Sequence, residues 1–175
     1  ARMMGGALSV RSQPGQGSCF MLHLPLVVAQ APVPVAPPEA FTSELVHGRW
    51  RFLVVDDHPL NRLLVRQVLL NAWPSCQVLE AVDGQKALEV LAAQAVDLVL
   101  MDMVMPVMDG IAATAAIRQN ASEQFQDLPI LGLTANVTPQ DLERFEAAGL
   151  NQVMLKPFEP AQLCGKVEQL LLTRA

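Results

Sequence analysis

Residues 97–110 read Asp-Leu-Val-Leu-Met-Asp-Met-Val-Met-Pro-Val-Met-Asp-Gly, a short apolar run followed by a loop that ends in Asp-Gly. The run Leu98–Met101 is entirely apolar, has the length of a buried strand, and ends abruptly at Asp102. A strand that is apolar on both faces is typical of a parallel sheet covered on both sides. Asp109-Gly110 then marks a turn before a helical pattern, and we interpret Asp109 as a turn residue rather than a ligand.

The same alternation of short apolar runs and helical patterns continues on both sides of this stretch. The other predicted strands are Phe52–Val55, Val78–Val82, Ile130–Leu133 and Val153–Leu155. Helical patterns follow the strands, and they begin near Pro59, Gly84, Ile111, Pro139 and Leu163. Thr138 is the predicted N-cap of the fourth helix, and Gly149 is its terminating glycine. Five strands alternating with five helices indicate an α/β domain with a parallel sheet and helices on both faces.

Two segments of different texture precede this domain. Residues 1–26 contain two short alternating runs around the turn signal Gln13–Gly17, which predicts a β-hairpin. An isolated hairpin is marginal in water, so we expect it to belong to a larger domain. Residues 27–50 are rich in Pro, Ala and Val, which predicts a semi-rigid linker. The expected organisation is therefore a hairpin, a linker and an α/β domain over residues 51–175.

Composition excludes several classes of function. The chain has 175 residues, of which 51% are hydrophobic, with a net charge of −5 and 3 scattered cysteines. No basic stripe stands out, so no nucleic-acid partner is expected. No apolar run reaches the ~18 residues that a bilayer requires, so this fragment is not expected to enter a membrane. The cysteines match neither a disulfide framework nor a zinc site, which fits a cytoplasmic location.

Reactive or charged side chains follow four of the five predicted strands. They are Asp56 and Asp57 after the first strand, Asp102 after the third, Thr134 after the fourth and Lys156 after the fifth. Because the carboxyl ends of parallel strands lie at one edge of a sheet, we expect these side chains to converge there. Three carboxylates in one pocket repel one another, so at least one of them is expected to have a raised pKa unless a cation binds.

This set of groups suits phosphoryl transfer. Mg²⁺ takes one or two carboxylates, keeps several waters and also binds phosphate oxygens. An Asp carboxylate can act as the nucleophile, while a lysine and a metal neutralise charge and a threonine hydroxyl donates to a phosphoryl oxygen. Each residue also has an ordinary interpretation, as a helix cap, a local turn or a surface lysine. Their joint occurrence at strand ends favours a site.

At these residues the chain resembles a known family. Residues 52–173 resemble the receiver domain of bacterial two-component response regulators over their full length. The motifs are Leu-Val-Val-Asp-Asp at 53–57, the stretch 97–110, Leu-Thr-Ala-Asn at 133–136 and Leu-Lys-Pro-Phe at 155–158. The resemblance implies a flavodoxin-like (βα)5 receiver fold, with a parallel five-stranded sheet in the order 2-1-3-4-5.

The resemblance also implies a role for each candidate residue in a Mg²⁺ site. Asp102 would be the phosphorylation site and a metal ligand. Asp57 would ligate Mg²⁺ directly, whereas Asp56 would act mainly through water. The backbone carbonyl of Val104 would be a further ligand.

Two further residues are implied to contact the phosphoryl group. They are Thr134 and Lys156, and the Lys156-Pro157 bond is expected to be cis. One position departs from the family pattern, because an aromatic residue often stands three positions before the lysine and here that residue is Val153. The family's aromatic switch would therefore lack its ring in this chain.

The N-terminal segment is similar to the last hairpin of a histidine-kinase ATPase domain, on the residues Met4–Val10, Ser12–Phe20 and Leu24-Pro25. The hairpin, linker and receiver together resemble the C-terminal end of a hybrid sensor histidine kinase. Such a parent protein can be anchored in the bacterial inner membrane. The implied partners are the kinase core of the same protein and a histidine phosphotransfer protein. This fragment would lack the ATP site and would catalyse only phosphorylation and dephosphorylation of its own aspartate.

Two alternative functions remain open at this point. One is a pseudo-receiver that only docks partners, and the other is an Asp-nucleophile phosphatase of the haloacid dehalogenase type. That phosphatase class carries a second acid two residues after the nucleophile, where this chain has Val104. The first predicted helix carries Leu60, Leu63 and Leu64 on one side, and we favour a core role for them over partner contacts.

Overall fold

The computed structural model describes two units of the chain, which divide between Pro37 and Pro38. The described residues are 7–13, 15, 17–23, 25, 48–120 and 123–173. Most of the predicted linker, residues 27–47, lies outside the described residues.

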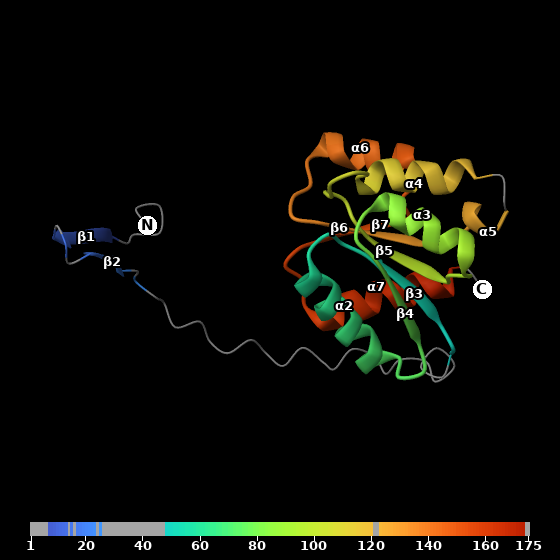
Figure 1. Cartoon of the computed structure of the whole chain (residues 1–175), viewed down its shortest axis with the longest axis horizontal. Helices are drawn as coiled ribbons and strands as arrows, with labels where there is room; N and C mark the ends of the chain where they lie inside the picture. Colours follow the sequence, from blue (N-terminus) through green and yellow to red (C-terminus); the bar gives the residue numbers. More distant parts are fainter. Residues whose placement is uncertain are drawn as a thin grey trace. The chain divides into compact units, whose positions relative to one another are not determined.

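The N-terminal unit is a two-stranded antiparallel hairpin (Figure 1). Strand β1 (Ala7–Gln13) pairs with β2 (Gly17–His23), and Val10 stands opposite Phe20. The side chains of Val10 and Phe20 are 57% and 71% exposed, so the hairpin leaves apolar surface open to solvent. The predicted hairpin is present, and its exposed apolar pair fits a larger domain better than an isolated ribbon.

The second unit is built on a five-stranded parallel sheet (Figure 1). Its strands are β3 (Arg51–Val55), β4 (Gln77–Ala81), β5 (Leu98–Asp102), β6 (Ile130–Thr134) and β7 (Gln152–Leu155). Their spatial order is β4-β3-β5-β6-β7, which is the predicted order 2-1-3-4-5. Each predicted strand is therefore present, with bounds that differ by at most one residue at either end.

Helices cover both faces of this sheet (Figure 1). One face carries α2 (Pro59–Ala72) and α7 (Pro160–Leu172), and the other carries α3 (Gly84–Ala93), α4 (Gly110–Gln119) and α6 (Pro139–Ala148). A one-turn helix, α5 (Glu123–Gln126), was not predicted because four residues are too few to show a helical period. In the described part of the chain, no helix is long and apolar enough to cross a membrane.

Alternation along the strands divides the core into two halves. Phe52 and Val54 pack with α2 and α7, whereas Leu53 and Val55 pack with α3 and α4. Successive strand residues point to opposite faces, so a strand covered on both sides must be apolar throughout. This accounts for the uninterrupted apolar run that precedes Asp102.

The N-caps predicted from sequence are formed. Thr138 and Asp141 make a reciprocal capping box at the start of α6, and Gly149 ends that helix with a φ of 87°. Asp109 accepts a hydrogen bond from the N–H of Ala112 at 2.8 Å and so caps α4. Asp109, predicted to be a turn residue, is thus the N-cap of α4.

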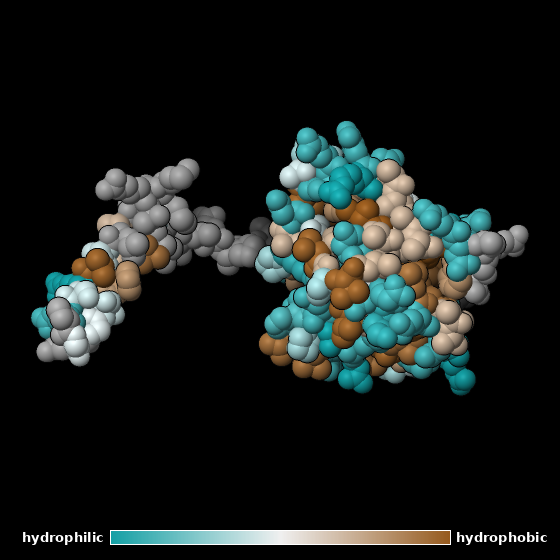
Figure 2. Space-filling model, turned by 45° about the horizontal axis from the view of Figure 1, so that its top comes forward, coloured by the Kyte–Doolittle hydropathy of each residue, from teal (hydrophilic) through white to brown (hydrophobic). Residues whose placement is uncertain are grey.

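The expectation of a core role for three leucines of α2 was wrong. Leu60, Leu63 and Leu64 are 65%, 54% and 55% exposed. The helix instead buries Val65, Val68 and Leu69, whose spacing of three and four residues forms the stripe that faces the sheet. On the face of the molecule in view in Figure 2, apolar residues (brown) reach the surface among polar ones (teal).

Candidate functional site

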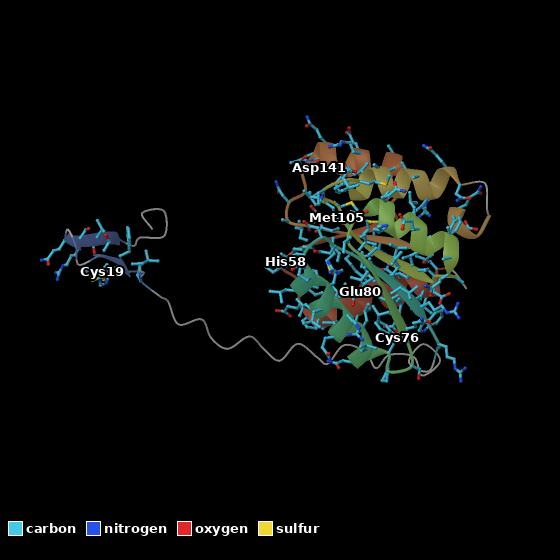
Figure 3. All side chains as sticks on the ribbon, viewed as in Figure 1. Cys19, His58, Cys76, Glu80, Met105 and Asp141 are labelled. Carbon is cyan, nitrogen blue, oxygen red and sulfur yellow. The ribbon has the colours of Figure 1, made fainter. Side chains whose placement is uncertain are left out.

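The carboxyl ends of the parallel strands bring three aspartates together. Asp56 and Asp57 follow β3 and Asp102 ends β5, and one carboxylate oxygen of each lies within 4.8 Å of the others. Figure 3 shows His58 and Met105 at this end of the sheet and Cys76 at the other. The predicted convergence of the three carboxylates is therefore present.

Lys156 joins this cluster from the end of β7. Its Nζ lies 2.7 Å from Oδ2 of Asp56 and 2.8 Å from Oδ2 of Asp102. Its backbone N–H donates to the carbonyl of Thr134 at 2.7 Å, and the Lys156-Pro157 bond is cis, as expected. A single ammonium group therefore bridges two of the three carboxylates.

Asp56 is almost fully buried and is surrounded by donors. The N–H of His58 donates to its Oδ1 at 2.8 Å, and the side-chain amide of Asn61 lies 3.1 Å from both carboxylate oxygens. Burial alone would raise the pKa of Asp56, but the hydrogen bonds from Lys156, His58 and Asn61 outweigh it and hold the pKa below its ordinary value. Asp56 is therefore ionised at neutral pH.

Asp102 shows the opposite balance. Burial raises the pKa of its carboxyl, and the charge of Asp56 adds to the effect. The bonds from Lys156 and from the N–H of Val104, at 3.2 Å, offset only part of it. The pKa of Asp102 therefore lies above its ordinary value, as predicted, although burial contributes more to the rise than repulsion by Asp56.

Lys156 keeps its proton in this setting. Burial alone would lower the pKa of its ammonium group, but the hydrogen bonds to Asp102 and Asp56 raise it further than burial lowers it. The cluster thus holds three carboxyl groups and one fixed positive charge. This excess of negative charge is the condition that a divalent cation relieves.

The third carboxylate faces solvent. Asp57 is exposed, and within residues 48–120 and 123–173 its side chain makes no hydrogen bond. A hard cation that keeps several waters fits an oxygen site of this kind, closed on one side and open on the other. Val104 lies beside the cluster with an exposed side chain, and ligation by its carbonyl stays a prediction.

Thr134 is the one candidate whose polar atom turns elsewhere. Its hydroxyl donates to the carbonyl of Asn136 at 2.8 Å. The N–H of Asn136 in turn donates to the hydroxyl oxygen of Thr134 at 3.4 Å. The hydroxyl is thus held in a local turn at the end of β6. Its predicted contact with a phosphoryl group requires that this turn open.

Sequence reasoning missed Asn61 and Arg62 of α2. The side chain of Asn61 reaches both oxygens of Asp56, and Arg62 donates to the carbonyl of Asp56 at 2.7 Å. Both residues lie in the first turn of the helix, where side chains lean back toward the helix start. That direction, with the acid pair just before the helix, was the available signal.

Comparisons with known proteins agree with this geometry. The response regulator receiver domain model matches residues 52–168. Sensor protein EvgS of Escherichia coli strain K12 is 38% identical over 158 residues, which cover 89% of this chain and 12% of that protein. The chain therefore spans about an eighth of the length of that relative.

Two solved structures share the fold. Chemotaxis protein CheY4 of Vibrio cholerae has a TM-score of 0.66 and 31% identity, over 71% of this chain and 100% of its own. The receiver domain of sensor histidine kinase PA1611 from Pseudomonas aeruginosa has a TM-score of 0.63 and 33% identity, over 71% and 98%. The PA1611 structure has a magnesium ion coordinated in its active-site cleft. With the family match covering more than half of its residues, this chain belongs to the response regulator receiver domain family.

Proposed function

We propose that residues 51–175 accept a phosphoryl group on Asp102 from a phosphohistidine, in a Mg²⁺-dependent reaction. The observation that carries the proposal is the contact between Lys156 and Asp102, made beside two further carboxylates. In the transfer, the P–N bond to histidine breaks and a P–O bond to a carboxylate oxygen of Asp102 forms. The protein has to hold an ionised nucleophile and neutralise the phosphoryl oxygens.

The metal ligands would be Asp57, Asp102 and the carbonyl of Val104, with Asp56 acting through water. When bound there, Mg²⁺ supplies positive charge that favours the ionised form of Asp102 and neutralises phosphoryl oxygens. The chain's own contribution is orientation. The N–H of Val104 and the ammonium of Lys156 hold the two oxygens of Asp102 in fixed directions.

Lys156 and Thr134 would respond to the modification. The Lys156 ammonium already lies between two carboxylates, so it can pair with a phosphoryl oxygen while keeping its bond to Asp56. The Thr134 hydroxyl would exchange the carbonyl of Asn136 for a second phosphoryl oxygen. This exchange frees the carbonyl of Asn136 and shifts the loop after β6.

The proposed receiver of the phosphoryl group is a histidine phosphotransfer protein. A 380 Å³ cleft is lined by Asp56 and Lys156 of the site together with Leu64, Pro157 and Phe158. The exposed leucines of α2 continue this apolar surface. A partner helix with an apolar face and a histidine could therefore pack on α2 and reach Asp102.

The proposed donor is the kinase core of the same protein. The alignment with EvgS covers 89% of this chain and so extends well before residue 52, where the receiver match begins. The exposed apolar pair Val10 and Phe20 of the hairpin fits the last strands of an ATPase domain at residues 1–26. On this proposal, residues 27–50 link the two domains of a cytoplasmic region whose parent protein can be membrane-anchored.

The test is incubation of the full chain with acetyl phosphate and MgCl2, followed by intact-mass measurement. One Mg²⁺-dependent phosphoryl group per chain is expected, and Asp102→Asn should abolish it. The matched control is Asp109→Asn, because Asp109 caps α4 nearby and lies outside the cluster. Label that persists in Asp102→Asn, or label that needs no Mg²⁺, would reject the proposal.

A further inference from the structure

Arg62 makes a bridge between the edge of the sheet and the acid pair. Its Nε lies 3.2 Å from Oε2 of Glu80 on β4, and its Nη1 donates to the backbone carbonyl of Asp56 at 2.7 Å. The Arg62 side chain is 14% exposed and that of Glu80 is 40% exposed, so water competes more with the ion pair than with the part-buried bond to the Asp56 carbonyl. One guanidinium group thus ties the loop after β3 to the neighbouring strand.

Glu80 is well placed to anchor that group. It stands opposite Val54 in the parallel pairing of β3 with β4, which is an edge strand of the sheet. The N–H of Asp56 also donates to the carbonyl of Ala81 at 3.3 Å. The main chain of Asp56 is therefore held through its N–H by β4 and through its carbonyl by Arg62.

This matters most for Asp57, the next residue. The carbonyl of Asp56 and the N–H of Asp57 belong to one planar peptide unit. Holding the carbonyl therefore also holds the backbone nitrogen and Cα of Asp57 in place. Since the described residues donate nothing to the Asp57 carboxylate, the main chain sets its position. Mg²⁺ demands near-ideal octahedral geometry, so a displaced carboxylate loses affinity.

We infer that Arg62 is a positioning residue for the metal site, acting through the peptide between Asp56 and Asp57 with Glu80 as its anchor. The inference rests on the proposed function, because it assumes that Asp57 ligates Mg²⁺. Arg62 itself touches neither the metal nor Asp102. Its loss weakens Mg²⁺ binding and leaves the chemistry at Asp102 intact once the metal is bound.

The experiment is calorimetric titration of the full chain with MgCl2. Arg62→Gln should raise the Mg²⁺ dissociation constant about 10-fold, the usual cost of losing a residue that orients a metal ligand. The matched control is Arg66→Gln. Arg66 lies 3.8 Å from the same glutamate, is half exposed and does not contact Asp56, so its replacement should leave the constant unchanged.

A second readout separates positioning from general damage. The rate of labelling by acetyl phosphate is measured against Mg²⁺ concentration. Arg62→Gln should shift the half-saturating Mg²⁺ about 10-fold and reach the wild-type rate at saturation. A rate that stays low at saturating Mg²⁺ overturns the inference, because Arg62 would then act on the reaction itself.

Two milder variants guard against a misfolded Arg62→Gln. Arg62→Lys keeps the positive charge but lacks the planar fork that places separate nitrogens on Glu80 and Asp56, so an intermediate loss of affinity is expected. Glu80→Gln keeps an acceptor without the charge and should cost less. Wild-type affinity in Arg62→Lys and Arg62→Gln overturns the inference alone, whereas a wild-type chain that binds no Mg²⁺ overturns the proposed function with it.

Discussion

The ammonium of Lys156 lies 2.8 Å from the carboxylate of Asp102, although 54 residues separate them in the chain. The same ammonium lies 2.7 Å from Asp56, which is 100 residues away. These two contacts link the carboxyl ends of β3, β5 and β7 to one another. Among the described residues, Lys156 is the only cationic side chain within ion-pair distance of the three aspartates.

Replacing Lys156 with Met should destabilise the protein without added metal. Two crowded carboxylates would lose their common counter-charge, and we expect a cost of about 2 kcal/mol, reduced by the partial exposure of the lysine. Urea unfolding in EDTA measures it. Lys166→Met is the control, because among the described residues Lys166 bonds only the side chain of Gln152. Equal stability of the two variants would contradict a balancing role for Lys156.

Replacing Asp102 with Asn should have the opposite effect in EDTA. The raised pKa of Asp102 means that its ionised form is disfavoured in the native state, and an amide oxygen still accepts from Lys156. We expect a gain in stability at neutral pH and loss of stabilisation by Mg²⁺. The finding that Asp102→Asn lowers stability in EDTA would count against the charge argument.

The gain from Asp102→Asn should depend on pH with a defined sign. A carboxyl whose pKa is raised in the native state contributes stability below its unfolded value, near 3.8, and loses it as the pH rises through the native pKa. Asp102→Asn has no ionisable group at this position and so does not lose stability in this way. Its advantage in EDTA should therefore grow from acid pH toward neutrality and then level off, as measured by urea unfolding across that range. An advantage that shrinks as the pH rises would contradict the assignment.

Replacing Val107 with Gly should stabilise the protein. Val107 has a φ of 69° and is the one non-glycine residue with positive φ among those described, and its side chain is 86% exposed. A β-branched side chain in that conformation is strained, and glycine removes the strain at an entropic cost. We expect a net gain of about 1 kcal/mol by thermal unfolding. Val104→Gly in the same loop, where φ is not positive, should instead lower stability.

Replacing Leu64 with Ser should slow phosphoryl exchange with a phosphotransfer protein and leave acetyl phosphate labelling unchanged. Leu64 lines the cleft beside Lys156 and is 55% exposed, so its loss removes partner contact more than core packing. We expect roughly 10-fold slower transfer. Leu172→Ser is the matched control, since Leu172 is 54% exposed on α7 and lies outside that cleft. Equal effects in both variants would place the docking surface elsewhere.

Much of this architecture was predictable because its signals are local. The apolar run before Asp102 predicts a doubly covered strand, and Thr138 followed by Pro139 predicts the start of α6. Convergence of the strand-end residues follows from parallel topology, which places every carboxyl end at one edge. The strand order came from the family resemblance.

What could not be predicted depends on tertiary packing. Leu60, Leu63 and Leu64 have helical spacing, but so do Val65, Val68 and Leu69, and only the docked helix decides which stripe meets the sheet. The bridge from Arg62 to Glu80 joins two elements whose relative placement no local pattern contains. The local turn of Thr134 was one of two interpretations that the sequence left open.

The position of β5 as the middle strand of the sheet has a consequence for signalling. Its residues alternate between the two apolar cores, Leu98 and Leu100 on the side of α2 and α7, and Val99 and Met101 on the side of α3 and α4. Asp102 terminates this strand, so a displacement at its end presses on both helical layers at once. A modification of Asp102 can therefore alter the helices on both faces of the sheet.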